Sequence, residues 1–149
     1  MKRYFFKKVG IDISEELLNR ILLAFLSEDM PDVATTENEA YFILNKTLLS
    51  TKNLTEFSAV NLGEGVKVSD VITDDGKIYV LGMREIREGY FETTVFEERD
   101  GSFEKKFGLL TQAAAGSFCK DGKDFYISLG RRDDPAASDM GRVLRVNGR

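Results

Sequence analysis

Histidine is absent from this chain of 149 residues, and cysteine and proline are scarce. Without histidine, the chain lacks the commonest general base near neutral pH and the commonest metal ligand. The lone cysteine, Cys119, has no partner for an internal disulfide, which favours a reducing compartment. No group that would activate a thiol nucleophile is evident, so we interpret Cys119 as a small buried apolar residue.

An excess of positive charge is also lacking, because 21 Lys and Arg residues are outnumbered by 25 Asp and Glu residues, so the net charge is −4 and the pI is about 5.0. This balance argues against a protein held to nucleic acid or to an anionic membrane by phosphate contacts. The basic start "MKRYFFKK" is followed by Asp12, Glu15 and Glu16, so no clean signal-peptide core exists. No apolar run approaches the roughly 18 to 20 residues needed to span a bilayer. We therefore predict a cytoplasmic protein.

One amphipathic helix is predicted, over residues 12–28. Asp12 and Glu15 have the spacing of a capping box, and Pro31 prevents the helix from continuing. Apolar residues recur at helical spacing on one face: Leu17, Leu18, Ile21, Leu22, Phe25 and Leu26. This face is expected to pack on a sheet.

Three later segments share a pattern of strand, polar turn and strand. They are "DVATTENEAYFIL" (32–44), "DVITDDGKIYVLG" (70–82) and "GSFCKDGKDFYISLG" (116–130). Asp75-Gly76 and Asp121-Gly122 are strong hairpin signals, since glycine accepts positive φ. Asn38 holds the corresponding place in the first segment. The second strands carry tyrosines that we interpret as equivalent: Tyr41, Tyr79 and Tyr126.

Each segment is followed by a second predicted hairpin, within 46–60, 90–107 and 141–149. Asp100-Gly101 and Asn147-Gly148 supply the turn signals of the last two. Four strands in each unit of roughly 40 residues resemble the blades of the β-propeller class. The resemblance covers residues 32–149 and rests on spacing and turn chemistry, because no family motif such as a WD dipeptide is present.

The resemblance implies a mainly β, propeller-like single domain, 1–149, with repeats at 32–64, 66–108 and 109–149. The third repeat stops before its fourth strand. The segment "FFKKVG" (5–10), in a predicted N-terminal strand at 1–11, matches "FEKKFG" (103–108) at four of six positions and would complete it.

Three blades are too few for a typical closed ring. Two chains could close a six-bladed ring as a homodimer, or the chain could be part of a longer protein. The alternative fold is α+β, a single twisted antiparallel sheet or sandwich covered by the helix.

Cations follow the second strand of each repeat: Lys46, Arg84, and Arg131 with Arg132. If they face one mouth of a ring, they could bind a carboxylate, a sulfate or a sugar acid. Nearby acidic residues, Asp133 and Asp134 among them, leave a solvated mixed-charge surface as the alternative. The loop "RRDDPAASDMGR" (131–142) is the expected contact surface.

Acidic residues are candidates for catalytic pairs and for metal ligands. A glycosidase pair could be drawn from Asp74, Glu92, Asp133 and Asp134, although the turn aspartates already have a structural role. Glu92, Glu97 and Glu98 are expected on an outer, solvent-facing strand. The "DDGK" and "KDGKD" segments lack the ligand series of a calcium loop, so no metal and no cofactor are predicted.

These patterns favour a non-catalytic binding or assembly module that takes a protein partner or associates with itself. A small anionic or sugar ligand is also compatible with them. One alternative is a small acidic inhibitor or immunity-type protein that caps a basic partner. Another is a carbohydrate-active enzyme, or a fragment of one, by analogy with other propellers.

Overall fold

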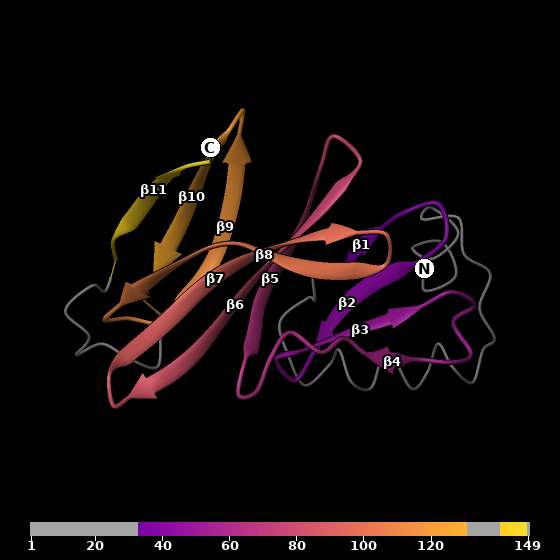
Figure 1. The fold of residues 1–149 in the computed structure, drawn as a ribbon, viewed down its shortest axis with the longest axis horizontal. Coiled ribbons are helices and arrows are strands. Elements are labelled where there is room, and N and C mark those ends of the chain that lie inside the picture. Colours follow the sequence, from indigo (N-terminus) through magenta and orange to yellow (C-terminus); the bar gives the residue numbers. More distant parts are fainter. Residues whose placement is uncertain (1–32, 131–140, 149) are drawn as a thin grey trace. The chain divides into compact units, whose positions relative to one another are not determined.

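The computed structural model describes residues 33–130 and 141–148, which form a mainly β, antiparallel structure (Figure 1). These residues contain eleven strands, arranged in three sheets. The chain divides into two compact units between Asn61 and Leu62. The predicted N-terminal strand (1–11) and helix (12–28) lie outside the described residues. Within the described part, no helix is long and apolar enough to cross a membrane.

The first unit contains one four-stranded meander, with strand order β1-β2-β3-β4. Its strands are β1 (Val33–Thr35), β2 (Ala40–Leu44), β3 (Thr47–Thr51) and β4 (Ser58–Ala59).

The turns of this sheet differ from the sequence prediction. The left-handed φ angles fall on Asn45 and Lys46, at 49° and 61°, and not on Asn38. The β1–β2 turn is closed instead by the Thr36 hydroxyl, which accepts hydrogen bonds from the N–H groups of Asn38 and Glu39. A side chain therefore does the work expected of a left-handed asparagine.

The second unit begins with a longer meander, of order β5-β6-β7-β8. Its strands are β5 (Lys67–Asp74), β6 (Lys77–Arg87), β7 (Tyr90–Arg99) and β8 (Ser102–Thr111). Asp75 and Gly76 have φ of 50° and 72°, and Asp100 and Gly101 have φ of 53° and 83°. Two consecutive positive φ angles are typical of type I′ turns, which confirms both predicted hairpins.

The third sheet has the order β11-β10-β9. Its strands are β9 (Ala115–Asp121), β10 (Asp124–Leu129) and β11 (Val143–Asn147). Asp121 pairs with Asp124, so the loop is Gly122-Lys123 and not the predicted Asp121-Gly122. Gly122 has a φ of 58°, whereas Asp121 and Lys123 have no positive φ. Glycine at the first loop position is typical of a type II′ turn.

The predicted turn at Asn147-Gly148 is wrong. Asn147 pairs with Asp124, and the Gly148 N–H donates to the Lys123 carbonyl at 2.8 Å. Gly148 has no positive φ, and a β-carbon there would lie 2.1 Å from the Lys123 carbonyl oxygen. Glycine is needed here because β11 passes so close to the β9–β10 loop, not because the chain reverses.

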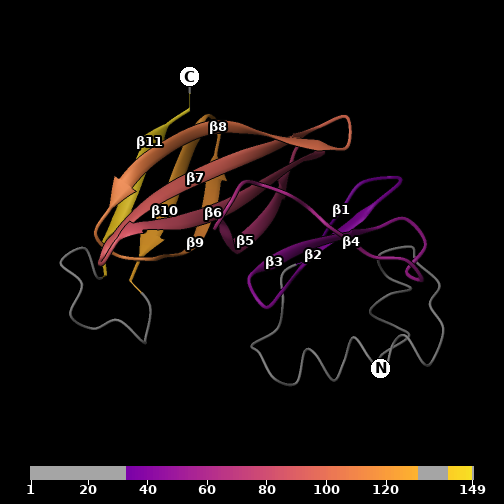
Figure 2. The same cartoon turned by 60° about the horizontal axis from the view of Figure 1, so that its bottom comes forward.

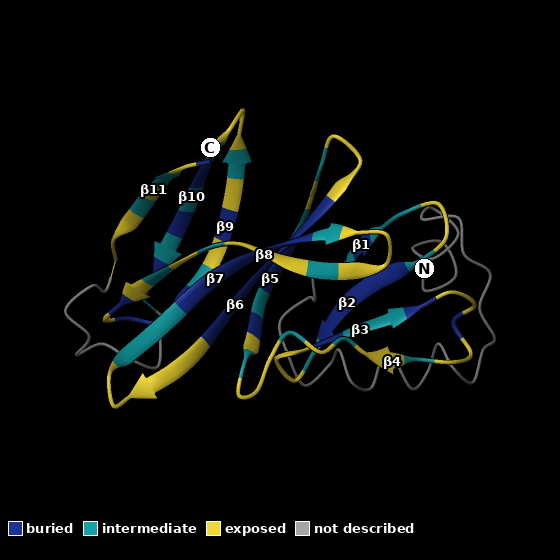
Figure 3. Cartoon of the chain, viewed as in Figure 1, coloured by how far each residue is buried: buried dark blue, intermediate teal, exposed yellow. Residues whose placement is uncertain are grey.

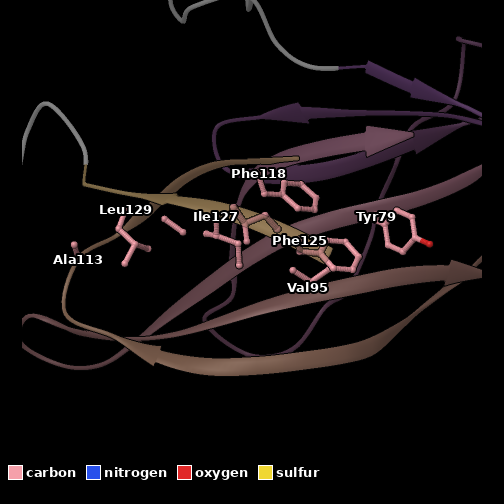
Figure 4. Packing of buried hydrophobic residues seen from close by; sticks show 9 residues of the cluster. Tyr79, Val95, Ala113, Phe118, Phe125, Ile127 and Leu129 are labelled. Atoms are coloured by element: carbon pink, nitrogen blue, oxygen red, sulfur yellow. The ribbon is translucent and has the colours of Figure 1, made fainter. Parts of the chain in front are cut away.

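The second and third sheets pack face to face around a cluster of buried side chains (Figure 4). Phe125 lies at its centre, with its ring centroid 5.3 Å from those of Tyr79 and Phe107 in edge-on contacts. Its ring also stacks on Phe118, at 6.4 Å. Large aromatic rings dominate the apolar area that this pairing of sheets removes from water.

The burial of β6 and the contact between β5 and β9 show how tightly the second unit is packed. Every residue of β6 from Ile78 to Met83 is buried, so this strand is covered on both faces (Figure 3). The first strands of the two sheets, β5 and β9, lie against each other. There the buried carboxylate of Asp70 accepts the Phe118 N–H at 3.0 Å.

The three tyrosines taken as equivalent do not share one environment. Tyr41 and Tyr79 are buried, whereas Tyr126 is only half-buried. Its neighbours Phe125 and Ile127 point into the core, so Tyr126 lies on the other face of the third sheet. Cys119, its cross-strand partner, is exposed, which overturns the prediction that it is buried.

The sheets span residues 33–59, 67–111 and 115–147, whereas the sequence predicts repeats at 32–64, 66–108 and 109–149. The second sheet ends at Thr111, three residues beyond the boundary expected at 108. That the chain forms one domain, and that its sheets are propeller blades, remain predictions.

Candidate functional site

A buried carboxylate marks one end of the second sheet. Glu97 of β7 pairs with Tyr79 of β6 and with Glu104 of β8, and its side chain is 6% exposed. The sequence placed Glu97 on an outer, solvent-facing strand. That prediction is wrong. Strand β7 is an inner strand, and Glu97 lies two residues after Val95, so both side chains point to the face that carries the core.

Three cations surround this carboxylate. The Lys77 ammonium lies 3.3 Å from Oε1, and the Arg99 guanidinium and the Lys106 ammonium lie 3.4 and 3.7 Å from Oε2. Lys106 is the extra residue of a β-bulge, because Val95 pairs with Phe107 while Phe96 pairs with Lys105. Such a bulge redirects the side chain of the unpaired residue, here toward Glu97.

The charge state of Glu97 follows from its surroundings. Burial alone raises the pKa of a carboxyl group, because it disfavours the charged form. For Glu97 this is outweighed by the hydrogen bond to Lys77, the charges of Lys106 and Lys77, and the hydrogen bond to Arg99, so its pKa is lowered. Glu97 is therefore a stable anion at neutral pH and not a proton donor.

Lys120 of β9 connects the turns of the two sheets. Its ammonium donates to Asp74 Oδ2 at 2.7 Å and to the Gly122 carbonyl, and it lies 5.6 Å from the centre of the Tyr79 ring. The hydrogen bond to Asp74 raises the pKa of Lys120. Burial, and then the charge of Glu97, raise the pKa of Tyr79. The β5–β6 and β9–β10 turns thus meet at one charged surface.

Two of the cations at this surface are exposed to solvent. Lys77 and Arg99 have side chains 60% and 62% exposed, which leaves donors free to reach a polar or anionic partner group. A general acid among carboxylates needs a raised pKa, and that of Glu97 is lowered. In the described part of the chain, no group of acidic and cysteine side chains could hold a metal ion.

The glycosidase pair Asp74 and Glu92 is too widely separated. Asp74 pairs with Lys77, and Glu92 pairs with Arg84 seven residues further along β6. At about 3.3 Å per residue, this is about 23 Å. Glycosidase carboxylates lie about 5 to 10 Å apart. The other two candidates, Asp133 and Asp134, lie outside the described residues.

The predicted anion-binding cations are only partly described. Lys46 is exposed in the β2–β3 turn of the first unit. Arg84, in the second unit, has its guanidinium 3.2 Å from the carboxylate of Glu92. Arg131 and Arg132 fall outside the described residues, so a shared anion site remains a prediction.

The sequence does not predict the cluster around Glu97 as a whole, although the strand register that forms part of it is predictable. The Asp100-Gly101 turn fixes the pairing of Arg99 with Ser102, and hence of Glu97 with Glu104. The bulge at Lys106 has no comparable sequence signal.

Comparison with known proteins gives no family for this chain. No family matches it, and no curated protein matches it. One similar structure is a chain in a solved S. cerevisiae complex of a Dbp5 variant bound to Nup159, a Gle1 variant, IP6 and ADP. The similarity covers 78% of this chain and 44% of the matched chain, at 14% identity and a TM-score of 0.32.

The N-terminal domain of Nup159 is similar over 81% of this chain and 47% of that chain, at 13% identity and a TM-score of 0.30. The chain therefore spans less than half of the length of either matched chain. Scores this low establish neither a shared fold nor a shared function.

Proposed function

We propose that this chain is a non-catalytic binding or assembly module built from propeller-like repeats. One observation carries the proposal: the second and third sheets are antiparallel meanders that pack face to face, with their first strands β5 and β9 adjacent. Neighbouring blades of a propeller meet in this way around a shared centre. The exposed donors of Lys77 and Arg99 at the turns supply a surface for a protein partner or a small anion.

Ring closure is the assembly that this proposal implies. Within the described residues, β11 is an edge strand of a three-stranded sheet, and Val143 on it is 64% exposed. Residues 5–10 resemble the segment 103–108, most of β8, which is the fourth strand of the second sheet. We propose that they add a fourth strand to β11, and that two chains close a six-bladed ring.

Light scattering coupled to size-exclusion chromatography tests this assembly. The expected mass is about twice the 16.8 kDa of one chain. In the alignment of the two segments, Val9 takes the place of Phe107, which packs on the core. Val9→Asp should therefore weaken assembly, whereas Lys7→Gln should not. A monomeric wild-type chain would rule out the dimeric ring.

A role as an acidic inhibitor is the second candidate, favoured by one arrangement. The three Asp-Gly segments of the second unit carry exposed aspartates, Asp75, Asp100 and Asp121. The first two turns lie at the same end of the second sheet, and Lys120 joins the third turn to that end. Retention on an immobilised lysine-rich peptide should fall with salt and with the triple change to asparagine. Retention unaffected by either would remove this candidate.

A further inference from the structure

Asn147-Gly148 is the only place in this sequence where an asparagine precedes a glycine. This dipeptide is chemically labile, because glycine has no side chain to keep its backbone nitrogen from the carbonyl carbon of the asparagine side chain. In the structure Asn147 is the exposed last residue of β11, and Gly148 follows it. The fold requires this glycine, since a β-carbon at residue 148 would lie 2.1 Å from the Lys123 carbonyl oxygen.

The pairing of β11 with β10 keeps the two reactive groups apart. The Gly148 N–H donates to the Lys123 carbonyl at 2.8 Å, so this nitrogen is directed toward the β9–β10 loop. Asn147 pairs with Asp124 in the extended backbone of a strand. The nitrogen can attack the side chain only after it loses its proton and turns away from Lys123. The folded sheet therefore suppresses the reaction.

Strand β11 lies where local opening is easiest, at the edge of a sheet. Among the described strands it pairs with β10 alone (Figure 2). Its residues alternate between exposed and half-buried, and none of them is fully buried. Segments with few buried apolar contacts open at a lower free energy than the core does. Each opening of β11 releases the Gly148 nitrogen from Lys123.

We propose that Asn147 is a spontaneous deamidation site that reacts only when β11 separates from β10, and that its product weakens the pairing of β11. In the open strand the Gly148 nitrogen bonds to the side-chain carbonyl carbon of Asn147. The C–Nδ2 bond breaks, and Nδ2 leaves as ammonia with the proton of the Gly148 nitrogen. Water then opens the cyclic imide at either carbonyl, which gives aspartate or isoaspartate at residue 147. Water is the only co-reactant.

The product would place a third carboxylate in one row of the sheet. Asp121, Asp124 and Asn147 lie opposite one another on the three strands, so they share one face. Arg145 is already paired with Asp124, with its Nε 2.9 Å from Oδ2. Like charges that lie directly opposite each other destabilise the pairing of strands. Isoaspartate also adds a methylene group to the backbone, which disturbs the register at the end of β11.

This inference does not rest on ring closure, because deamidation needs only the opening of β11 in a single chain. If residues 5–10 do pair with β11, they protect Asn147 further, and its deamidation would weaken the ring. The two proposals are tested by different measurements. One depends on the mass of the assembly, and the other depends on the chemistry of residue 147.

Mass spectrometry of the peptide that contains Asn147 measures the reaction. Deamidation of the folded chain should be at least about tenfold slower than in concentrated urea at the same pH and temperature, because opening must precede the reaction. Equal rates in the two conditions would overturn the gating by β11. No deamidation in urea would overturn the site.

Two neighbouring residues of β11 supply a matched test of the gating. Leu144 packs against the core cluster, whereas Val143 is 64% exposed. Leu144→Ala should speed deamidation of the folded chain about fivefold, because it makes opening easier. Val143→Ala should leave the rate unchanged. Circular dichroism checks that both variants are folded, and equal rates in the two folded variants would contradict the gating.

Hydrogen exchange of the β11 amides tests the effect of the product. Asn147→Asp has the same side chain as one product, and it should raise exchange about twofold to fivefold through the repulsion from Asp124. Asn147→Ser removes the amide without adding a charge, so its exchange should stay close to that of the wild type. Equal exchange in the two variants would overturn the proposed weakening of β11.

Discussion

The carboxylate of Asp70 in β5 and the backbone N–H of Phe118 in β9 are joined by a hydrogen bond of 3.0 Å. Asp70 is buried, and its other oxygen accepts the N–H of Val71 at 2.9 Å. One acidic side chain thus accepts hydrogen bonds from backbone N–H groups of both sheets.

Replacing Asp70 should therefore destabilise the second unit. Hydrogen bonds to charged groups contribute about 1.5–3 kcal/mol, so we expect Asp70→Asn to lower the free energy of unfolding by about 2 kcal/mol. Asp100→Asn removes the same charge from an exposed turn and keeps a residue that tolerates positive φ. Urea denaturation should separate the two variants, and equal stabilities would contradict the role given to Asp70.

Adjacent aromatic residues of β10 should differ sharply in their effect on stability. Phe125 is fully buried and contacts three rings, whereas Tyr126 lies on the half-buried face. Phe125→Ala should cost about 3–5 kcal/mol, and Tyr126→Ala about 1 kcal/mol. If Phe125→Ala does not fold, Phe125→Leu should still be the less stable of the pair. A larger loss from a change at Tyr126 would mean that the faces of β10 are reversed.

Glu97 should make stability depend on acidic pH. Its pKa is lowered in the folded state, so its contribution is present above the unfolded value of about 4.3 and is lost as pH falls through the lower folded value. The free energy of unfolding of the wild type should exceed that of Glu97→Gln by about 2 kcal/mol at pH 7, and this difference should shrink below about pH 4. Chemical denaturation at several pH values measures this.

Glu104 supplies the matched control, since it lies opposite Glu97 with a side chain 59% exposed. Glu104→Gln should lower the free energy of unfolding at pH 7 much less than Glu97→Gln does, because exposed ion pairs contribute little. A Glu97→Gln difference that stays constant down to pH 3 would show that the effect is not one of charge.

Two glycines of the third sheet should respond differently to alanine. A β-carbon at Gly148 would meet the Lys123 carbonyl oxygen at 2.1 Å, whereas one at Gly116 would meet nothing closer than 3.6 Å. Gly148→Ala should cost about 1–3 kcal/mol through overpacking, and Gly116→Ala should be tolerated. Equal thermal denaturation midpoints would argue that Gly148 does not pack beside the β9–β10 loop.

The hairpins were predictable because their turns depend on local chemistry. Asp75-Gly76 and Asp100-Gly101 adopt the predicted turns, which fix the register of the strands on either side. Gly122 shows the limit of this reasoning, since an Asp-Gly pair allows glycine to occupy either loop position. Strand pairing around Phe125 decides between them, and that depends on distant residues.

The charged cluster was not predictable in the same way. Glutamate beside alternating apolar residues is typical of a solvent-facing strand, and this was the interpretation of Glu97. The structure buries Glu97 because three cations converge on it, one of them through a bulge that no short sequence pattern indicates. Tertiary context thus overrides local periodicity at this position.

The continuous burial of β6 has a consequence for strand alignment. A strand with one solvent-exposed face resists a register shift of one residue, because the shift would move its apolar side chains from the core face to the solvent face. From Ile78 to Met83 the side chains on both faces are buried, so a register shift of one residue would leave most of these apolar side chains buried. The register of β6 must then be fixed at its start, by the Asp75-Gly76 turn and by the ion pair of Lys77 with Glu97. A residue inserted at that reversal should shift the whole strand, whereas one inserted in the Glu88-Gly89 loop should not.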